Sequence, residues 1–361
     1  MARALDIRDV FTFAADDQLA ATLFPGANIQ VVNRLGGGDL ARRRWQWFLP
    51  VMARTWAAVD LNGYELIVTS SHAAVNAVQP APGAKLISYC HTPMRYAWDW
   101  RPEIGRIPLP LRPFWPAIAR RLQAQDRRRA QNVTQFVANS KHVAERIRSY
   151  YGKTAIVVYP PVDTTFWTPA DGPADEPKDD YFLVAGRLVA YKRADIAVRA
   201  AALAGVRLVV AGSGPDIARL KRIAGSKVEF VEEPGQTELR DLYRSARALV
   251  FPGVEDFGMT MIEAQACGTP VIAFKRGGAL EAVVDGVTGL LYDDPTPTGL
   301  ATVLKKVDTG RYSREALRSH AERFDARRFD ERFLAVVTAV LDGSVGVLAA
   351  DELADGGEHD L

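Results

Sequence analysis

The chain has 361 residues, which is too long for one ordinary hydrophobic core and predicts two domains. It is 48% hydrophobic and 24% charged, a composition typical of a soluble α/β protein. Its two cysteines, Cys90 and Cys267, lie far apart, which excludes a disulfide framework and a zinc-binding spacing. Charges near the N-terminus and within Val336–Ala350 argue against a signal peptide and a spanning helix, so we expect a cytoplasmic protein.

The net charge of +2 conceals an asymmetry between the two halves of the chain. Residues 1–165 contain 21 Lys and Arg against 12 Asp and Glu, whereas the remainder contains 24 against 31. A basic first half favours an anionic partner, such as a membrane surface or a phosphorylated acceptor, although a plain solvated surface accounts for it equally well. No stretch is typical of a nucleic-acid-binding module.

The first half contains apolar runs separated by helical stretches. Val10–Phe13 and Ala27–Val32 are the earliest strand candidates, and the glycines Gly36–Gly38 lead from them into a basic stretch. Further runs predict buried strands at Leu66–Thr69, Lys85–Tyr89, Gln135–Ala138 and Ile156–Tyr159. His91 follows the second of these runs and is therefore expected at a strand end. Without further information a structural role explains both His91 and His72.

Two stretches of the first half combine arginine with aromatic side chains. Arg42–Trp56 places apolar residues from Trp45 to Trp56 at helical spacing, and Arg112–Arg129 contains six arginines together with Phe114. This combination fits a patch that lies at a membrane interface and reaches a lipid-linked acceptor. The alternative is that the aromatic side chains belong to the core.

The segment Thr168–Asp180 is rich in proline, glycine and acids and reads as an interdomain linker. Short apolar runs again alternate with helical stretches beyond it, which predicts a second parallel sheet. The runs are Tyr181–Ala185, Arg207–Ala211, Val228–Val231, Ala248–Phe251, Val271–Phe274 and Gly289–Tyr292. Because parallel sheets bind ligands at the carboxyl ends of their strands, the junctions that follow these runs are the candidate site.

The first two junctions carry cations and glycines. Arg187 follows a strand and Lys192 precedes a helix, so both could hold a diphosphate, although surface charges are the simpler explanation of this junction alone. Gly212 and Gly214 follow the next strand and would let a ligand approach the backbone ahead of a helix N-terminus. An ordinary tight turn explains these glycines equally well.

The third junction carries two glutamates eight residues apart, Glu255 and Glu263. Pro252-Gly253 and Gly258 place Glu255 in a loop, whereas Glu263 falls on the helix that follows. The backbone of Phe257, Gly258 and Met259 would present N–H groups to a phosphate at the start of that helix. Glu263 could accept hydrogen bonds from two ribose hydroxyls, and Glu255 could reach the sugar beyond the phosphates.

The stretch EDFGMTMIEAQACGTPVIAF, with GRLVAYK upstream and GGALEAVVDGVTGLLYD downstream, resembles the E-x7-E signature of retaining nucleotide-sugar glycosyltransferases of family four. The similarity covers residues 181–294. A further stretch, SYCHTPMRYAWDW, is similar to bacterial mannosyltransferases that use GDP-mannose and build lipid-linked polysaccharide units.

This resemblance implies the GT-B fold, in which two Rossmann-like domains face a cleft that holds the nucleotide sugar. It implies that Arg187 and Lys192 bind the diphosphate, Glu263 the ribose and Glu255 the sugar. His91 would lie beside the reacting sugar. The resemblance also implies a lipid-linked saccharide as acceptor. The basic and aromatic stretches predict a peripheral protein on the inner face of the cytoplasmic membrane.

Charge stabilisation of the leaving diphosphate carries the predicted reaction, because no Asp or Glu is placed as a covalent nucleophile. The chain contains no D-x-D triplet, so we expect no metal requirement and no cofactor besides the nucleotide-sugar donor. A nucleotide-sugar epimerase and a non-catalytic nucleotide-sugar-binding protein remain the alternatives. We also predict that the first domain lacks the strand and the Gly-rich loop with which chains of this family open.

The expected organisation follows from these elements. Residues 1–167 form an acceptor-side Rossmann-like domain, residues 168–180 a linker, and residues 181–320 a nucleotide-sugar-binding domain. Residues 321–341 form a helical segment that could pack back on the first domain, and residues 342–361 a disordered tail.

Overall fold

The protein is described from a computed structural model, which covers residues 5, 7–33, 49–71, 74–101, 104, 107, 109–172 and 180–346. The chain forms two compact units, one of Met1–Val158 with Asp330–Leu361 and the other of Tyr159–Phe329. This division differs from the expected boundary at residue 167. The backbone N–H of Val162 donates to the carbonyl oxygen of Phe324 at 2.9 Å, so the segment after residue 158 is tied to the end of the second unit.

The second unit contains one six-stranded parallel sheet in the order β12-β11-β10-β7-β8-β9. Its strands agree with the six predicted apolar runs: β7 (Tyr181–Ala185), β8 (Arg207–Ala211), β9 (Val228–Val231), β10 (Ala248–Phe251), β11 (Val271–Phe274) and β12 (Gly289–Tyr292). The central strands are apolar on both faces because helices cover both faces of the sheet.

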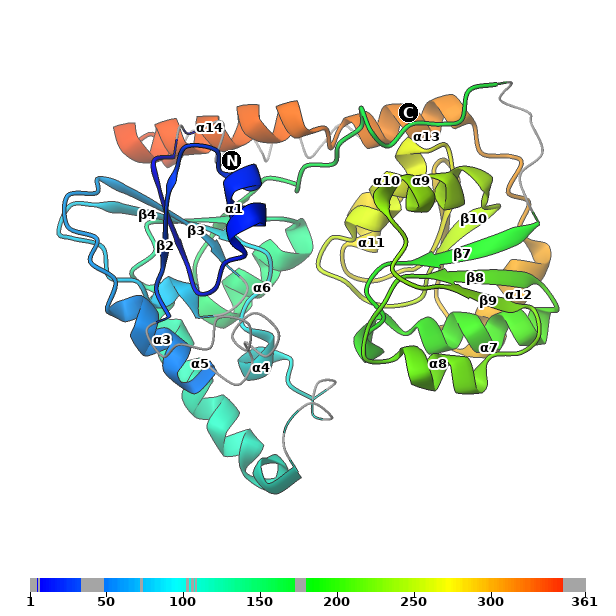
Figure 1. The fold of residues 1–361 in the computed structure, drawn as a ribbon, viewed down its shortest axis with the longest axis horizontal. Helices are drawn as coiled ribbons and strands as arrows, with labels where there is room; N and C mark the ends of the chain where they lie inside the picture. Colours follow the sequence, from blue (N-terminus) through cyan, green and yellow to red (C-terminus); the bar gives the residue numbers. More distant parts are fainter. Residues whose placement is uncertain are drawn as a thin grey trace. The chain divides into compact units, whose positions relative to one another are not determined.

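The helices of the second unit form two layers (Figure 1). One face of the sheet packs against α7 (Ala194–Ala204), α8 (Ile217–Ile223) and α12 (Pro297–Lys306). The other packs against α9 (Gln236–Ser245), α10 (Met259–Ala266) and α13 (Arg314–Glu322). Two short elements, η5 (Ala190–Lys192) and α11 (Ala279–Ala282), follow β7 and β11.

The first unit contains a four-stranded parallel sheet in the order β3-β4-β5-β6. These strands are β3 (Leu66–Ser71), β4 (Lys85–Cys90), β5 (Gln135–Ala138) and β6 (Ala155–Val157). The last begins and ends earlier than the predicted run Ile156–Tyr159. A separate parallel pair consists of β1 (Asp9–Thr12) and β2 (Asn28–Val31), joined by α1 (Asp17–Leu23).

The β1–β2 pair and the four-stranded sheet share no ladder within the described ranges. Both early strand candidates of the sequence therefore form strands, but in a sheet of their own. The glycines Gly36–Gly38 lie outside the described residues. The absence of an inner strand and of a Gly-rich loop stays a prediction.

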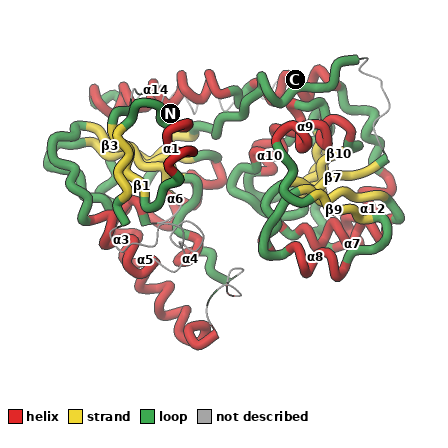
Figure 2. Tube along the Cα trace, viewed as in Figure 1, coloured by secondary structure: helices red, strands yellow, loops and turns green. Residues whose placement is uncertain are grey.

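Helices lie beside the four-stranded sheet as well (Figure 2). One face packs against α3 (Leu49–Ala57), α5 (Trp115–Ala130) and α6 (Lys141–Tyr151), and shorter turns are η2 (Val75–Ala77), α4 (Arg95–Trp98) and η4 (Leu109–Phe114). The long helix α14 (Ala326–Asp342) begins in the second unit, and its residues from Asp330 on belong to the first. There the ring of Phe333 lies edge-on to that of Tyr89, with centroids 6.1 Å apart.

No helix in the described ranges combines the length and the hydropathy that crossing a bilayer requires.

Candidate active site

Three strand-to-loop junctions of the second unit meet at the carboxyl end of its sheet. They follow β7, β8 and β10, which are neighbours in the sheet. The backbone N–H of Leu188, after β7, donates to the carbonyl oxygen of Ser213, after β8, at 2.8 Å. A Cβ atom on Gly253, after β10, would lie 2.6 Å from the carbonyl oxygen of Lys192. The loops are therefore packed directly against one another.

Glycines make this close packing possible. A Cβ atom on Gly212, whose φ is +135°, would lie 2.1 Å from the carbonyl oxygen of Gly186. One on Gly214 would lie 2.2 Å from the carbonyl oxygen of Leu188. Both distances are far below van der Waals contact, so loop packing by itself requires the two glycines. Their predicted contact with a donor stays a prediction.

Lys192 lies where the three junctions meet. Its Nζ is 3.0 Å from Oε1 of Glu255, and the two side chains are 18% and 17% exposed. A Cβ atom on Gly186 would lie 3.5 Å from this Nζ and 3.7 Å from the Cγ2 atom of Thr260, in the first turn of α10. A cation therefore stands between the end of β7 and the N-terminus of α10, where an anion is favoured.

The loop that carries Glu255 is held from both sides. The carbonyl oxygen of Glu255 accepts the backbone N–H of Gly278 at 2.8 Å. The ring of Phe257 is buried in the core. Gly258, with φ +93°, is the N-cap of α10, and Met259, the first residue of the helix, is exposed. As Pro252-Gly253 and Gly258 predicted, Glu255 lies in a loop and Glu263 on the helix that follows.

Glu263 points toward a buried tyrosine of α9. The hydroxyl of Tyr243 donates to Oε2 of Glu263 at 3.1 Å. Burial raises the pKa of Glu263 above its ordinary value, while the hydrogen bond from Tyr243 and the charge of Lys192 oppose that rise. Lys192 thus acts on both glutamates of the motif, because it pairs with Glu255 and lowers the cost of ionising Glu263.

Arg187 is on the β7 junction, and its side chain is exposed. No ion pair joins it to Glu255 or Glu263 among the described residues. The structure thus brings Lys192, Glu255 and Glu263 together and leaves Arg187 extending into solvent. A bound anion could contact both Lys192 and Arg187 and so link the exposed arginine to the rest of the cluster.

His91 belongs to the first unit, whereas the other predicted residues belong to the second. It follows β4 directly, as predicted. Its Nε2 lies 2.8 Å from Oγ of Ser70, its ring is edge-on to Tyr89 at 5.1 Å, and its carbonyl oxygen accepts from Asn139 at 3.1 Å. The imidazole is therefore held in one orientation at the carboxyl end of the sheet. His72 lies outside the described residues.

Several residues after His91 make packing contacts and hydrogen bonds with neighbouring helices. The indole N–H of Trp98 donates to buried Asp126 at 2.8 Å, and its ring stacks on Tyr150 with centroids 4.3 Å apart. Arg146 of α6 pairs with Asp99 and donates to the hydroxyl of Thr92 at 2.9 Å. The stretch that resembled mannosyltransferases therefore anchors the loop after His91 to α5 and α6.

The two basic and aromatic stretches differ in the burial of their apolar side chains. Met52 and Trp56 are buried in the core of the first unit, so the prediction that Arg42–Trp56 forms an interfacial patch is wrong for its described part. The apolar stripe of α3 packs into that core instead, beside η2. In Arg112–Arg129, by contrast, Phe114 is 66% exposed, and Leu109, just before this stretch, is 73% exposed.

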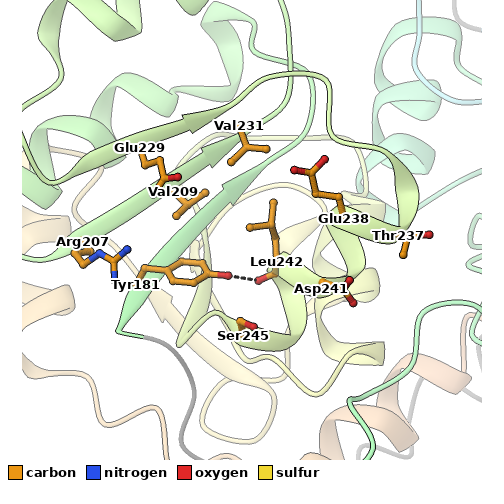
Figure 3. Close-up of a pocket in the computed structure, with 10 residues that line it drawn as sticks. All are labelled: Tyr181, Arg207, Val209, Glu229, Val231, Thr237, Glu238, Asp241, Leu242 and Ser245. Atoms are coloured by element: carbon orange, nitrogen blue, oxygen red, sulfur yellow. Dashed lines mark hydrogen bonds between the residues drawn. The ribbon is translucent and has the colours of Figure 1, made fainter.

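A hollow of about 760 Å³ lies elsewhere in the second unit, between α9 and the β8–β9 edge of the sheet (Figure 3). None of the predicted site residues lines it. Its walls carry the carboxylates of Glu229, Glu238 and Asp241 against one cation, Arg207. This charge would repel a diphosphate, so the hollow does not suit the predicted donor.

Sequence reasoning missed Gly186, Thr260 and Tyr243. Gly186 opens the quoted GRLVAYK stretch, and a glycine directly after a predicted strand was the detectable signal for its φ of +120°. Tyr243 falls on the buried face of an amphipathic helix and is indistinguishable in sequence from a core residue.

The chain matches two protein-family models. Residues 1–166 match Glycosyltransferase Family 4, and residues 170–324 match Glycosyl transferases group 1. The chain is 33% identical over 244 residues to D-inositol 3-phosphate glycosyltransferase 1 of Catenulispora acidiphila, which covers 58% of each chain. It is 34% identical over 245 residues to the D-inositol 3-phosphate glycosyltransferase of Mycolicibacterium gilvum, covering 61% of this chain and 53% of that protein. The chain thus spans a little over half the length of these curated relatives.

Solved structures share the fold at low sequence identity. Anabaena HepE, in complex with UDP and glucose, matches with a TM-score of 0.66 at 17% identity over 92% of this chain and 91% of that chain. Sucrose-phosphate synthase from Thermosynechococcus elongatus matches with a TM-score of 0.64 at 21% identity over 89% and 82%. Each family model matches less than half of the chain, and the solved structures show that the chain shares the GT-B fold, with its two Rossmann-like halves.

Proposed function

We propose that the chain is a retaining glycosyltransferase that moves mannose from GDP-mannose onto a lipid-linked or polysaccharide acceptor. The observation that carries this proposal is the meeting of Lys192, Glu255 and Glu263 at the carboxyl ends of neighbouring parallel strands. A diphosphate needs a cation and helix N–H groups, and a sugar needs carboxylate acceptors. The site offers these groups within one unit of the chain.

Each residue has a role in the proposed reaction. Lys192 and exposed Arg187 bind the diphosphate, with the N-terminal turn of α10 behind it. Glu263 accepts the ribose hydroxyls and Glu255 the hydroxyls of the sugar, while the role of His91 stays a prediction from the sequence. The bond from the anomeric carbon to the diphosphate breaks as the acceptor oxygen bonds to the same face. The acceptor proton passes to the leaving diphosphate, whose charge Lys192 and Arg187 stabilise without a metal.

The comparisons name other donors and acceptors, which define the alternatives. HepE was solved with UDP, and the curated relatives are named for D-inositol 3-phosphate. A UDP-sugar donor and a phosphorylated polyol acceptor are therefore the second candidates for this chain. The basic first half suits either anionic acceptor, a polyprenyl diphosphate or a polyol phosphate.

We further propose that the protein binds a membrane surface from the cytoplasmic side, through η4 and the start of α5. Leu109, Leu111 and Phe114 are exposed there, and Arg120 and Arg121 of α5 follow as exposed cations. Exposed apolar side chains beside arginines suit the interface of an anionic bilayer.

One assay tests the donor, the acceptor and the reaction class. The protein is incubated with GDP-mannose or UDP-glucose, in magnesium or in chelator, and with a polyprenyl-diphosphate saccharide, inositol phosphate or no acceptor. We expect transfer from GDP-mannose to the lipid-linked acceptor in the presence of chelator. Isomerised nucleotide sugar without transfer would indicate an epimerase, and binding without either product a non-catalytic protein. Tighter binding of UDP than of GDP would exclude the proposed donor.

A further inference from the structure

Tyr243 is fixed in place more firmly than a core side chain requires. None of its side chain is exposed, and its ring lies edge-on to that of Trp167, with centroids 5.5 Å apart. Its carbonyl oxygen accepts the hydroxyl of Thr269. The preceding carbonyl, that of Leu242, accepts the hydroxyl of Tyr181 at 2.9 Å (Figure 3). Side chain and backbone are therefore both held, and the hydroxyl of Tyr243 has a fixed position.

That hydroxyl contacts one oxygen of Glu263. The distance from Tyr243 Oη to Glu263 Oε2 is 3.1 Å. A glutamate carboxylate rotates easily about its last bond, and one anchored oxygen removes this freedom. The other oxygen, Oε1, then faces a constant direction, and Oε2 keeps a second lone pair. A fixed pair of acceptors is what two neighbouring hydroxyls of a ribose would need.

We propose that Tyr243 is a positioning residue for the ribose of the nucleotide-sugar donor, acting through Glu263. The inference rests on the proposed function, in which Glu263 accepts the ribose hydroxyls. Tyr243 itself touches no ligand, since it is fully buried. Its effect should appear in nucleotide affinity and not in the chemical step.

The electrostatics of the pair point the same way. Burial raises the pKa of Glu263, and the hydrogen bond from Tyr243 and the charge of Lys192 lower it. Burial and the charge of Glu263 raise the pKa of Tyr243, and Cys267, the C-cap of α10, adds to that rise. Glu255 forms its ion pair with Lys192. Removing the hydroxyl should therefore raise the pKa of Glu263 further. Nucleotide affinity that depends on ionised Glu263 would then begin to fall at a higher pH in the variant than in the wild type.

Tyr243→Phe removes the hydroxyl alone, and Tyr181→Phe is a matched control. Both tyrosines are buried, and both hydroxyls donate one hydrogen bond, but that of Tyr181 goes to a backbone carbonyl of α9. We would measure the dissociation constants of GDP and of 2′,3′-dideoxy-GDP by calorimetry across pH 4.5–8 on the full chain. Glu263→Gln is measured alongside.

We expect Tyr243→Phe to weaken GDP binding about tenfold and to reduce the preference for GDP over its dideoxy analogue. The acid limb of its binding curve should move to higher pH, whereas Tyr181→Phe should keep the wild-type preference and acid limb. If Tyr243→Phe keeps the wild-type preference and acid limb while Glu263→Gln has lost the preference, the inference about Tyr243 is wrong but the ribose role of Glu263 stands. If Glu263→Gln also keeps it, the proposed ribose role fails as well.

A second measurement applies if Tyr243→Phe does not fold. Tyr181→Phe labelled with 3-fluorotyrosine has a more acidic hydroxyl at Tyr243, which strengthens the hydrogen bond to Glu263. The acid limb of GDP binding should then move to lower pH relative to the unlabelled variant. An unchanged acid limb overturns the inference.

Discussion

Lys192 and Glu255 form a largely buried ion pair, with Nζ 3.0 Å from Oε1. In the proposed function, Lys192 binds the diphosphate and Glu255 binds the sugar. The cation and the acid would therefore have to exchange this contact for contacts with the donor. Such an exchange costs less than the desolvation of two unpaired charges, because the loops already hold both groups at the site.

Glu255→Gln should reduce glycosyl transfer about a hundredfold or more while leaving the protein folded, because the carboxylate acts on the sugar in the transition state. Initial rates at saturating donor would measure the effect. The control is Glu232→Gln, which breaks an ion pair with Lys221 whose side chains are about half exposed. Equal rates for the two variants would remove Glu255 from the proposed site.

Gly212→Ala should lower the free energy of unfolding by more than about 2 kcal/mol, because the new Cβ collides with the backbone of Gly186. Gly205→Ala also places a side chain at a positive φ, +72°, but nothing lies within 4 Å of the Cβ position. This control should lose only about 1 kcal/mol, the cost of the backbone conformation. Urea denaturation compares the two. A smaller loss for Gly212→Ala than for Gly205→Ala would contradict the loop packing described above.

Stability at acidic pH should depend on His320. Burial lowers its pKa to about 4, helped by the charge of Arg323, and its Nδ1 lies 2.8 Å from Oε1 of Gln265. The folded protein therefore binds this proton less readily than the unfolded chain, whose histidine titrates near 6.5. Stability contributed by neutral His320 is present above pH 6.5 and lost as the pH falls toward 4.

We expect wild type to lose about 3 kcal/mol relative to His320→Gln between these pH values. Unfolding free energies at intervals between pH 4 and 7 would measure the difference, in which all other titrations cancel. A constant difference across that range would mean that His320 titrates normally in the folded protein.

Leu109→Ser with Phe114→Ser should weaken binding to anionic vesicles at least about tenfold, because each large apolar side chain contributes about 2 kcal/mol when it leaves water. Vesicle co-sedimentation in low salt gives the partition constant. Leu203→Ser is the control, since Leu203 is 55% exposed on α7 of the second unit. A partition constant that does not change with the double substitution, the lipid charge or the ionic strength would contradict the proposed membrane-binding surface.

The six strands of the second unit could be predicted residue by residue from the sequence. Each is a short apolar run that ends in a polar or glycine-containing junction, and a strand covered on both faces needs no other signal. The loop position of Glu255 and the helical position of Glu263 followed from Pro252, Gly253 and Gly258 in the same way.

Pairings across the fold could not be predicted. Lys192 meets Glu255, and Tyr243 meets Glu263, only after separate strands have been placed side by side. The burial of Trp56 was equally ambiguous, because an apolar stripe on a helix suits a core and a membrane alike. Local pattern fixes which face is apolar, and tertiary packing decides what covers it.

The membership of α14 in both units bears on the order in which the units can fold during synthesis. Phe333 has no exposed side chain, and its ring lies against Tyr89 of β4. The core around β4 therefore lacks a buried aromatic ring until Phe333 has been synthesised, and that residue follows all of Tyr159–Phe329 in the chain. The unit that is translated first therefore cannot complete its packing before the second unit has been synthesised.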